Sequence, residues 1–239
     1  SNDFTTLNQK LNEGQFNSER IIRLRGKDKL DASGALVADV NGDVLIEANS
    51  NGVDNTVKAH TFRLTADNGK IDVLGSIDAS GEQGGVITLS ARDDVTLHGG
   101  SVLDAHATAS QTPSGSRGGR VELVTSAGSI DMQKQAAIDV SGSTLGGHVL
   151  LRAPITASDV NIAPIAGTIK GASDVTVEAV KVYQYQTDTL IDSSLMSAWQ
   201  SELSTFMDTA NIDAIKTRLG KTSDAAFHVV PGLEVQSAQ

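Results

Sequence analysis

The stretch that decides the fold reads Ile77-Asp78-Ala79-Ser80-Gly81, followed closely by Gly84-Gly85-Val86-Ile87-Thr88-Leu89. Its order is an aliphatic residue, an aspartate and small residues, then paired glycines and a short alternating run. The other copies are Leu103-Asp104-Ala105 with Gly118-Gly119, Ile138-Asp139-Val140 with Gly146-Gly147 and, without the glycine pair, Leu30-Asp31-Ala32-Ser33-Gly34. Four occurrences of so particular a string indicate an internal repeat.

Short runs with apolar residues at alternate positions separate these strings, and this pattern is typical of β-strands. The runs are Phe62/Leu64, Ile71/Val73, Val95/Leu97, Ile130/Met132, Val160/Ile162 and Val175/Val177. A repeat every three strands predicts an all-β parallel β-helix of about seven coils, in which inward residues stack in files and the rod core is roughly 30–35 Å long. The file predicted for one sheet is Leu24, Ile46, Leu64, Leu89, Leu123, Leu151 and Val177.

The composition agrees with a thin aliphatic core and excludes several functions. Aromatic residues make up 3% of the 239 residues, whereas glycine occurs 23 times, which suits tight corners where backbone packs on backbone. The paired glycines are predicted to mark one such corner. A net charge of −10 argues against nucleic-acid binding. The absence of cysteine excludes disulfides, thiolate zinc sites and cysteine nucleophiles. No apolar stretch is long enough for membrane insertion.

The pattern divides the chain into four parts. Residues 1–19 are predicted to form an N-terminal cap or a distorted coil, and residues 20–187 the β-helix. Residues 188–222 are predicted to form a helical excursion packed on the side or the end of the rod, because apolar residues recur there at three-to-four spacing after Asp192. Residues 223–239 return to strand alternation.

The repeats carry a resemblance to a known family. Gly69-Lys70-Ile71-Asp72-Val73, Gly118-Gly119-Arg120-Val121-Glu122-Leu123 and the tail Phe227-His228-Val229-Val230-Pro231-Gly232-Leu233-Glu234-Val235 resemble segments of filamentous-haemagglutinin-like exoproteins. The resemblance implies a right-handed β-helical shaft, secretion to a Gram-negative cell surface by an outer-membrane transporter partner, and roles in virulence such as adhesion, haem acquisition or toxin presentation. The family's secretion signature is not recognised here.

Two acidic patterns are candidate sites of chemistry. The aspartates of the repeat could recruit Ca²⁺ if stacked; the favoured interpretation is that each bonds backbone N–H groups at a corner. These aspartates are Asp31, Asp78, Asp104 and Asp139. The set Asp93, Asp94 and His98 could supply acid–base catalysis on a glycosidic bond. A solvated strand is the favoured interpretation.

The remaining candidates concern binding rather than catalysis. His106 and His148 could approach one another across coils and bind a metal, but surface histidines are the favoured interpretation. The basic run Arg20, Arg23, Arg25, Lys27 and Lys29 forms one positive patch, and residues 107–116 form an inserted loop. Candidate partner-binding residues are Arg23, Arg25, Thr108, Gln111, Ser114, Arg117 and Trp199. No catalytic residue, metal site or cofactor is predicted.

The sequence therefore predicts a non-enzymatic, monomeric rod segment of a secreted or surface bacterial exoprotein. Its role would be adhesion to a host-cell surface or glycan receptor, or that of a stalk presenting a distal site. The alternatives are a carbohydrate-active β-helix enzyme, namely a polysaccharide hydrolase, lyase or phage-type depolymerase, and a haem-acquisition exoprotein. A carboxylate-lined groove would favour the enzyme, and paired histidines on a protruding loop would favour haem binding.

Overall fold

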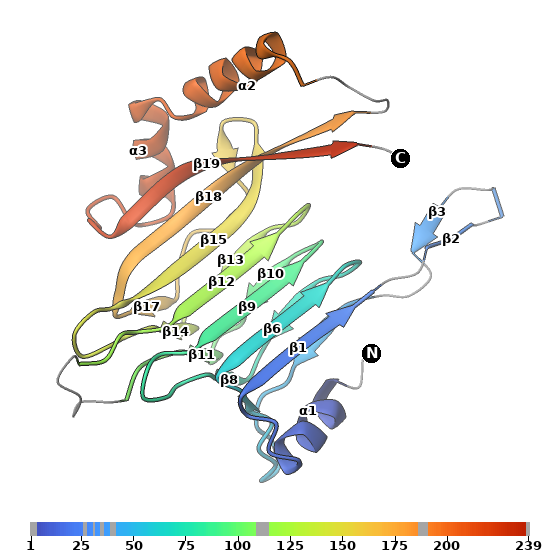
Figure 1. Ribbon diagram of the computed structural model, residues 1–239, viewed down its shortest axis with the longest axis vertical. Helices are drawn as coiled ribbons and strands as arrows, with labels where there is room; N and C mark the ends of the chain where they lie inside the picture. The colour runs from blue at the N-terminus through green and yellow to red at the C-terminus, as the bar shows by residue number, and fades with distance from the viewer. Residues whose placement is uncertain are drawn as a thin grey trace.

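The computed structural model describes residues 4–25, 28–30, 32–33, 36–38, 42–108, 115–185 and 191–237. Three parallel sheets form a stack with helices at both ends (Figure 1). The eight-stranded sheet runs β1 (Glu19–Leu24), β6 (Thr61–Ala66), β9 (Val86–Ala91), β12 (Arg120–Thr125), β15 (Gly147–Thr156), β18 (Ala172–Tyr185) and β19 (Phe227–Ser237), with β16 (Asp159–Val160) antiparallel beside β15. The chain is thus an all-β, solenoid-like protein in its described residues.

The two smaller sheets take one strand from each repeat. The four-stranded sheet holds β4 (Val44–Ile46), β7 (Ile71–Val73), β10 (Val95–Leu97) and β13 (Ile130–Met132). The five-stranded sheet holds β5 (Val57–Lys58), β8 (Ser76–Asp78), β11 (Val102–Asp104), β14 (Ala137–Asp139) and β17 (Thr168–Lys170). An antiparallel pair, β2 (Asp28–Leu30) and β3 (Leu36–Ala38), lies between β1 and β4 in the sequence. Successive repeats visit the three sheets in the same order, which is what the recurring string predicts.

One continuous file of aliphatic side chains runs through the eight-stranded sheet. Leu64, Leu89, Leu123, Leu151 and Val177 are register partners on consecutive strands, and all are buried. Stacking of similar side chains along parallel strands fills the thin core without aromatic rings.

Two predicted members of this file were wrong. Ile22, rather than Leu24, opposes Leu64, because both β1 residues point inward and Leu24 lies one pair further along, opposite Ala66. Ile46 belongs to the four-stranded sheet, where it opposes Val73. The first repeat contains the additional antiparallel pair β2–β3. The residue spacing of the later repeats therefore does not locate the strands of the first one.

The paired glycines do stack at one corner, as predicted. A Cβ on Gly84 would collide with the backbone of Gly118 and Gly119 in the next repeat. A Cβ on Gly118 would meet the backbone of Val140 and Gly147. Glycine is required there because neighbouring turns touch through their backbones.

Helix α1 (Phe4–Glu13) lies at the N-terminal end of the stack (Figure 1). Phe4 is buried and its ring packs edge-on against Phe62 of β6, with centroids 6.4 Å apart. The helix also contacts β4 and β5. It therefore covers apolar side chains that the first strands would otherwise expose.

Helices α2 (Ser193–Phe206) and α3 (Thr209–Arg218) lie at the opposite end of the stack from α1 (Figure 1). The carboxylates of Asp192 and Asp208 accept backbone N–H groups and begin the two helices. Phe206, Ile215 and Leu219 join the core. These helices fall within the predicted excursion 188–222, and β19 falls within the predicted strand region.

Candidate functional site

Charged side chains on the outward face of the eight-stranded sheet pair with one another. Arg63 donates to Thr88 (3.3 Å), Thr88 donates to Glu122 (2.9 Å), and Arg120 donates to the other oxygen of Glu122. Further along, Arg152 forms an ion pair with Glu178 at 2.6 Å. Such exposed pairs contribute little stability, but they leave few free charges on this face.

The predicted basic patch is split between the surface and the core. Arg23 is outward and pairs with Asp67 at 3.0 Å, and Arg25 is exposed. Arg20 is instead only 4% exposed, which corrects its assignment to a surface patch. Arg20 lies on the same side of β1 as Ile22, so strand alternation directs it inward.

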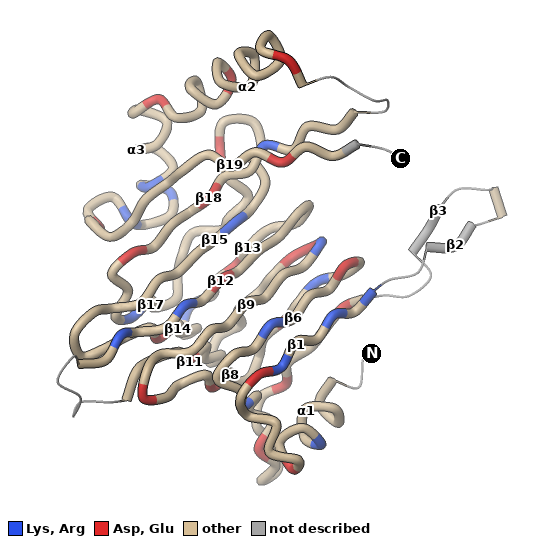
Figure 2. Tube along the Cα trace, in the orientation of Figure 1, with Lys and Arg blue, Asp and Glu red and all other residues tan. Residues whose placement is uncertain are grey.

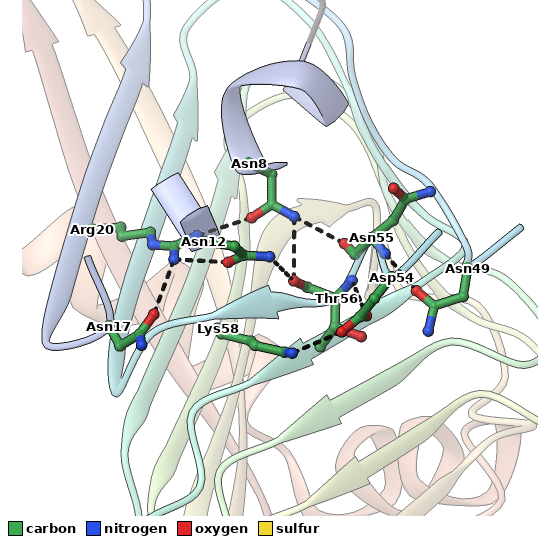
Figure 3. A network of polar contacts seen from close by, with 9 residues as sticks. All are labelled: Asn8, Asn12, Asn17, Arg20, Asn49, Asp54, Asn55, Thr56 and Lys58. Atoms are coloured by element: carbon green, nitrogen blue, oxygen red, sulfur yellow. Dashed lines mark hydrogen bonds and ion pairs between the residues drawn. The ribbon is translucent and has the colours of Figure 1, made fainter. Parts of the chain in front are cut away.

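Arg20 is held by a hydrogen-bond network that no sequence pattern predicts (Figure 3). Its guanidinium donates to Asn8 Oδ1 at 2.9 Å and to Asn12 Oδ1 at 2.8 Å. It also donates to the carbonyl of Phe16 at 2.7 Å. The amides of Asn8 and Asn12 then donate to the carbonyl of Thr56, just before β5. This network ties α1 to the first strands.

The aspartate column lies on three consecutive strands of the five-stranded sheet. Asp78, Asp104 and Asp139 are register partners. Each accepts the backbone N–H two residues later, at 2.9–3.0 Å. The corner interpretation is therefore confirmed for these three, and Asp31 lies outside the described residues. Lys170 Nζ closes one end of the column, 2.6 Å from Asp139.

The set Asp93, Asp94 and His98 is not assembled into one acid–base site. Asp94 accepts from the backbone N–H and the hydroxyl of Ser129, in the next repeat. His98 Nε2 lies 2.9 Å from Asp72 Oδ1, in the previous repeat. Burial alone would raise the pKa of Asp72, but hydrogen bonds from His98 and a neighbouring lysine outweigh it, so this pKa lies below its ordinary value.

Three further histidines pair with carboxylates in different parts of the stack. His106 Nδ1 lies 2.6 Å from Asp104, after a strand of the five-stranded sheet. His148 and His228 flank Asp174 on the eight-stranded sheet, at 3.8 and 3.6 Å. His106 and His148 thus belong to different sheets and have different partners. Within the described part of the chain, no group of three acidic or histidine side chains has the geometry to hold a metal ion.

The inserted loop is described only at its two ends. Thr108 Oγ1 donates to the carbonyl of Gly81 at 2.9 Å, and the Arg117 N–H donates to Gln83 Oε1 at 2.9 Å. Both ends therefore rest on the turn of the previous repeat. Gln111 and Ser114 lie outside the described residues.

Trp199 lies at the C-terminal end, far along the stack from the other candidates. Its side chain is 7% exposed and its ring packs on Tyr183, with centroids 5.0 Å apart. Tyr183 donates to Glu202 at 2.7 Å. Burial, and after it the hydrogen bond to this carboxylate, raises the pKa of Tyr183 to about 12. Trp199 thus anchors α2 on β18. The predicted binding residues therefore occupy three separate parts of the stack.

A groove of about 370 Å³ lies between α2 and β19. We call it the α2–β19 groove; its lining residues are Met196, Trp199, Gln200, Leu203, Ser204, Met207, Pro231 and Leu233. Of these residues, only Trp199 was a predicted partner-binding residue. The sequence shows that Pro231 and Leu233 alternate with outward residues. It does not show that they lie opposite a helix.

Comparisons with known proteins add no relative. No family model, no curated protein and no solved structure matches the chain. None of the helices in the described residues combines the length and apolar character needed to cross a lipid bilayer.

The α2–β19 groove is lined by no carboxylate, and three further clefts among the described residues have one carboxylate at most. Hydrolysis of a glycosidic bond requires two carboxyl groups facing one substrate. The α2–β19 groove is the strongest candidate site because it joins apolar walls to a sheet edge.

Proposed function

We propose that this chain is a non-enzymatic, rod-like segment of a secreted or surface-anchored bacterial exoprotein. It acts in adhesion or as a stalk that presents a distal site. The observation that supports the proposal most is the unbroken aliphatic file through β6, β9, β12, β15 and β18. A core that grows by one strand per repeat extends in one direction, which gives length and stiffness from a simple pattern.

We further infer that the three sheets close into a right-handed parallel β-helix of about seven coils. The order in which successive repeats visit the three sheets supports this, and so do the glycine corners, where turns of neighbouring repeats pack directly on one another. Small-angle X-ray scattering tests the rod: an elongated particle supports it, whereas a sphere of the same mass contradicts it.

Surface display is tested by labelling intact cells of the producing bacterium with an antibody against the chain. We expect labelling that external protease removes, while a periplasmic control protein stays protected. Signal confined to permeabilised cells would contradict the proposal. Release of reducing sugars from a polysaccharide panel by the purified chain would favour the enzyme alternative instead.

A further inference from the structure

The connection between β4 and β5 contains an exposed turn with an asparagine followed by a glycine. Asn51 and Gly52 form its tip, and the backbones of Ser50 and Val53 bridge in antiparallel fashion below them. Both tip residues have a positive φ, of 51° and 77°. Asparagine and glycine adopt this conformation at the lowest cost, so the tip has the residues that a two-residue hairpin turn favours.

The tip of this turn is held weakly. Two hydrogen bonds close it, from the Ser50 N–H to the Val53 carbonyl at 3.2 Å and from the Val53 N–H to the Ser50 carbonyl at 2.8 Å. No described residue forms a hydrogen bond with the Asn51 side chain or the Gly52 N–H. Apart from its chain neighbours, no heavy atom lies within 4 Å of the position that a Gly52 Cβ would take. The tip can therefore rotate without displacing a neighbour, and its local opening costs little.

The base of the turn is fixed, in contrast to its tip (Figure 3). Asn55 is only 5% exposed. Its N–H donates to Asn49 Oδ1 at 2.7 Å, and its side-chain amide donates to the Ala48 carbonyl at 2.9 Å. Asn8 of α1 donates to the Asn55 carbonyl at 2.9 Å. Motion of the tip therefore leaves the base and α1 in place.

An asparagine before a glycine can react with its own backbone, because glycine has no Cβ to obstruct the approach. The Gly52 nitrogen gives up its proton and attacks Cγ of Asn51. The new N–C bond closes a five-membered succinimide, and the Cγ–N bond of the side-chain amide breaks and releases ammonia. Water then opens the ring at either carbonyl. Opening at Cγ gives aspartate, whereas opening at the main-chain carbonyl gives isoaspartate, whose backbone runs through Cγ.

A second asparagine–glycine pair, Asn68–Gly69, lies in a restrained part of the stack. The Asn68 carbonyl accepts the Gly42 N–H and the Gly69 carbonyl accepts the Asp93 N–H, each at 3.1 Å. Gly69 is buried, and a Cβ there would collide with the backbone of Gly42 and Asp43. Closing a ring at this pair would break contacts with both neighbouring repeats. The fold therefore makes the same chemistry easy at one pair and costly at the other.

We propose that Asn51 is a site of spontaneous modification, at which the folded chain converts asparagine to aspartate and isoaspartate with water as the co-reactant. The isoaspartyl product has a free α-carboxylate on an exposed turn. Such a group is the class of substrate that protein carboxyl methyltransferases accept, with S-adenosylmethionine as the methyl donor. This inference goes beyond the stalk function and does not depend on it.

The test follows the full, folded chain during incubation at neutral pH by peptide mapping with mass spectrometry. We expect the peptide that contains Asn51 to gain about 1 Da as an amide becomes a carboxylate. The gain should be at least about tenfold faster than in the peptide that contains Asn68, because the latter reacts only after local opening of the stack. Methyl transfer to the incubated chain by an isoaspartyl methyltransferase should show that isoaspartate is among the products.

The unfolded chain provides the control. In concentrated urea we expect the Asn51 and Asn68 peptides to react at similar rates, since the fold no longer distinguishes the two pairs. The third pair, Asn41–Gly42, is mapped on its own peptide because Asn41 lies outside the described residues.

A glutamine variant assigns the reaction to one side chain. Asn51→Gln would have to close a six-membered ring, so the gain in mass should be at least about tenfold slower at this peptide and unchanged at Asn68. Glutamine suits the backbone of the tip, since Gln15 and Gln135 also have a positive φ, of 58° and 70°. Equal urea midpoints of the fresh variant and the fresh wild type show that the fold is kept.

Three outcomes contradict the inference. Equal rates at Asn51 and Asn68 in the folded chain would show that the fold does not select the site. An unmodified Asn51 in the folded chain, with both pairs reacting in urea, would show that the turn protects this residue. An undiminished gain in mass at the same peptide of Asn51→Gln would place the reaction at another residue.

Discussion

Arg20 is a buried cation whose partners are all neutral oxygens. Burial lowers the pKa of its guanidinium, yet an arginine stays charged at any physiological pH. Fixed amide oxygens from Asn8 and Asn12 replace the water that the charge has lost. The hydrogen bonds of this one residue therefore connect α1 to the first strands.

Replacement of Arg20 tests that connection. We expect Arg20→Ala to lower the free energy of unfolding by about 2–4 kcal/mol, because several buried acceptors lose their donor at once. Urea denaturation followed by circular dichroism measures it. Arg25→Ala, at an exposed position on the same segment, should change it by less than about 0.5 kcal/mol. Equal effects of the two substitutions would contradict this account.

The corner glycines permit a second test at single positions. Gly118→Ala forces a methyl group into the backbone of Val140 and Gly147, and we expect it to cost about 3 kcal/mol or more. Gly52, in contrast, has a positive φ of 77° but open space around it. Gly52→Ala should therefore cost only about 1 kcal/mol of backbone strain. Thermal unfolding of the two variants would show the difference, and a tolerated Gly118→Ala would refute the close contact.

At the scale of the element, outward charges connect neighbouring strands. Asp139 of β14 and Lys170 of β17 are register partners as well as an ion pair. Burial alone would raise the pKa of Asp139, but hydrogen bonds from Lys170 and Ser141 outweigh it, so the pKa lies below its ordinary value. The pairing therefore stabilises the fold above the ordinary pKa and is lost as the pH falls through the lowered one.

Acidification tests this pair. We expect Asp139→Asn to be less stable than the wild type at pH 7, and the gap to narrow as the pH falls from about 4 toward the lowered pKa. Urea midpoints at neutral and acidic pH give the comparison. Asp213→Asn, on the exposed face of α3, should leave the midpoints unchanged throughout. A gap that persists in acid would exclude the ionised pair as its cause.

Removal of α1 is a test at the same scale. Deleting residues 1–16 removes the burial of Phe4, which is worth about 2–3 kcal/mol, and exposes Phe62. It also leaves the Thr56 carbonyl without the hydrogen bonds that Asn8 and Asn12 donate. We expect lower stability and association of chains through the bared end, seen by sedimentation velocity. Unchanged unfolding and sedimentation would show that α1 does not protect that end.

The sequence predicted elements where a local pattern carries the information. The helix start at Asp192 and the strand alternation around Leu89 are local patterns, so both could be predicted. The pairing of Ile22, rather than Leu24, with Leu64 could not be predicted, because two inward residues on one strand look alike until a partner strand fixes the register. The contacts of Asn8 with Thr56 and of Trp199 with Tyr183 join distant segments that no spacing rule connects.

For the whole molecule, the stack predicts graded local stability. Inward residues of β9 and β12 such as Leu89 and Leu123 are fully buried, with a strand on either side. Among the described strands β19 pairs with β18 alone, and Val230 is 37% exposed. In hydrogen exchange, we expect amides of β9 and β12 to be protected at least about tenfold longer than those of β19. Uniform protection along the stack would indicate a single cooperative unit instead.

The direction of the ladder bonds makes the molecule mechanically anisotropic. Bonds such as Arg120 N–H to the Gly85 carbonyl (2.9 Å) point from one repeat to the next. Tension between the two ends of the stack pulls along these bonds and peels strands away singly, at low force. Tension along a strand shears a whole ladder together and meets far greater resistance. A force applied along the strands is therefore resisted by whole sheets. A force applied between the two ends of the stack instead extends the protein one strand at a time.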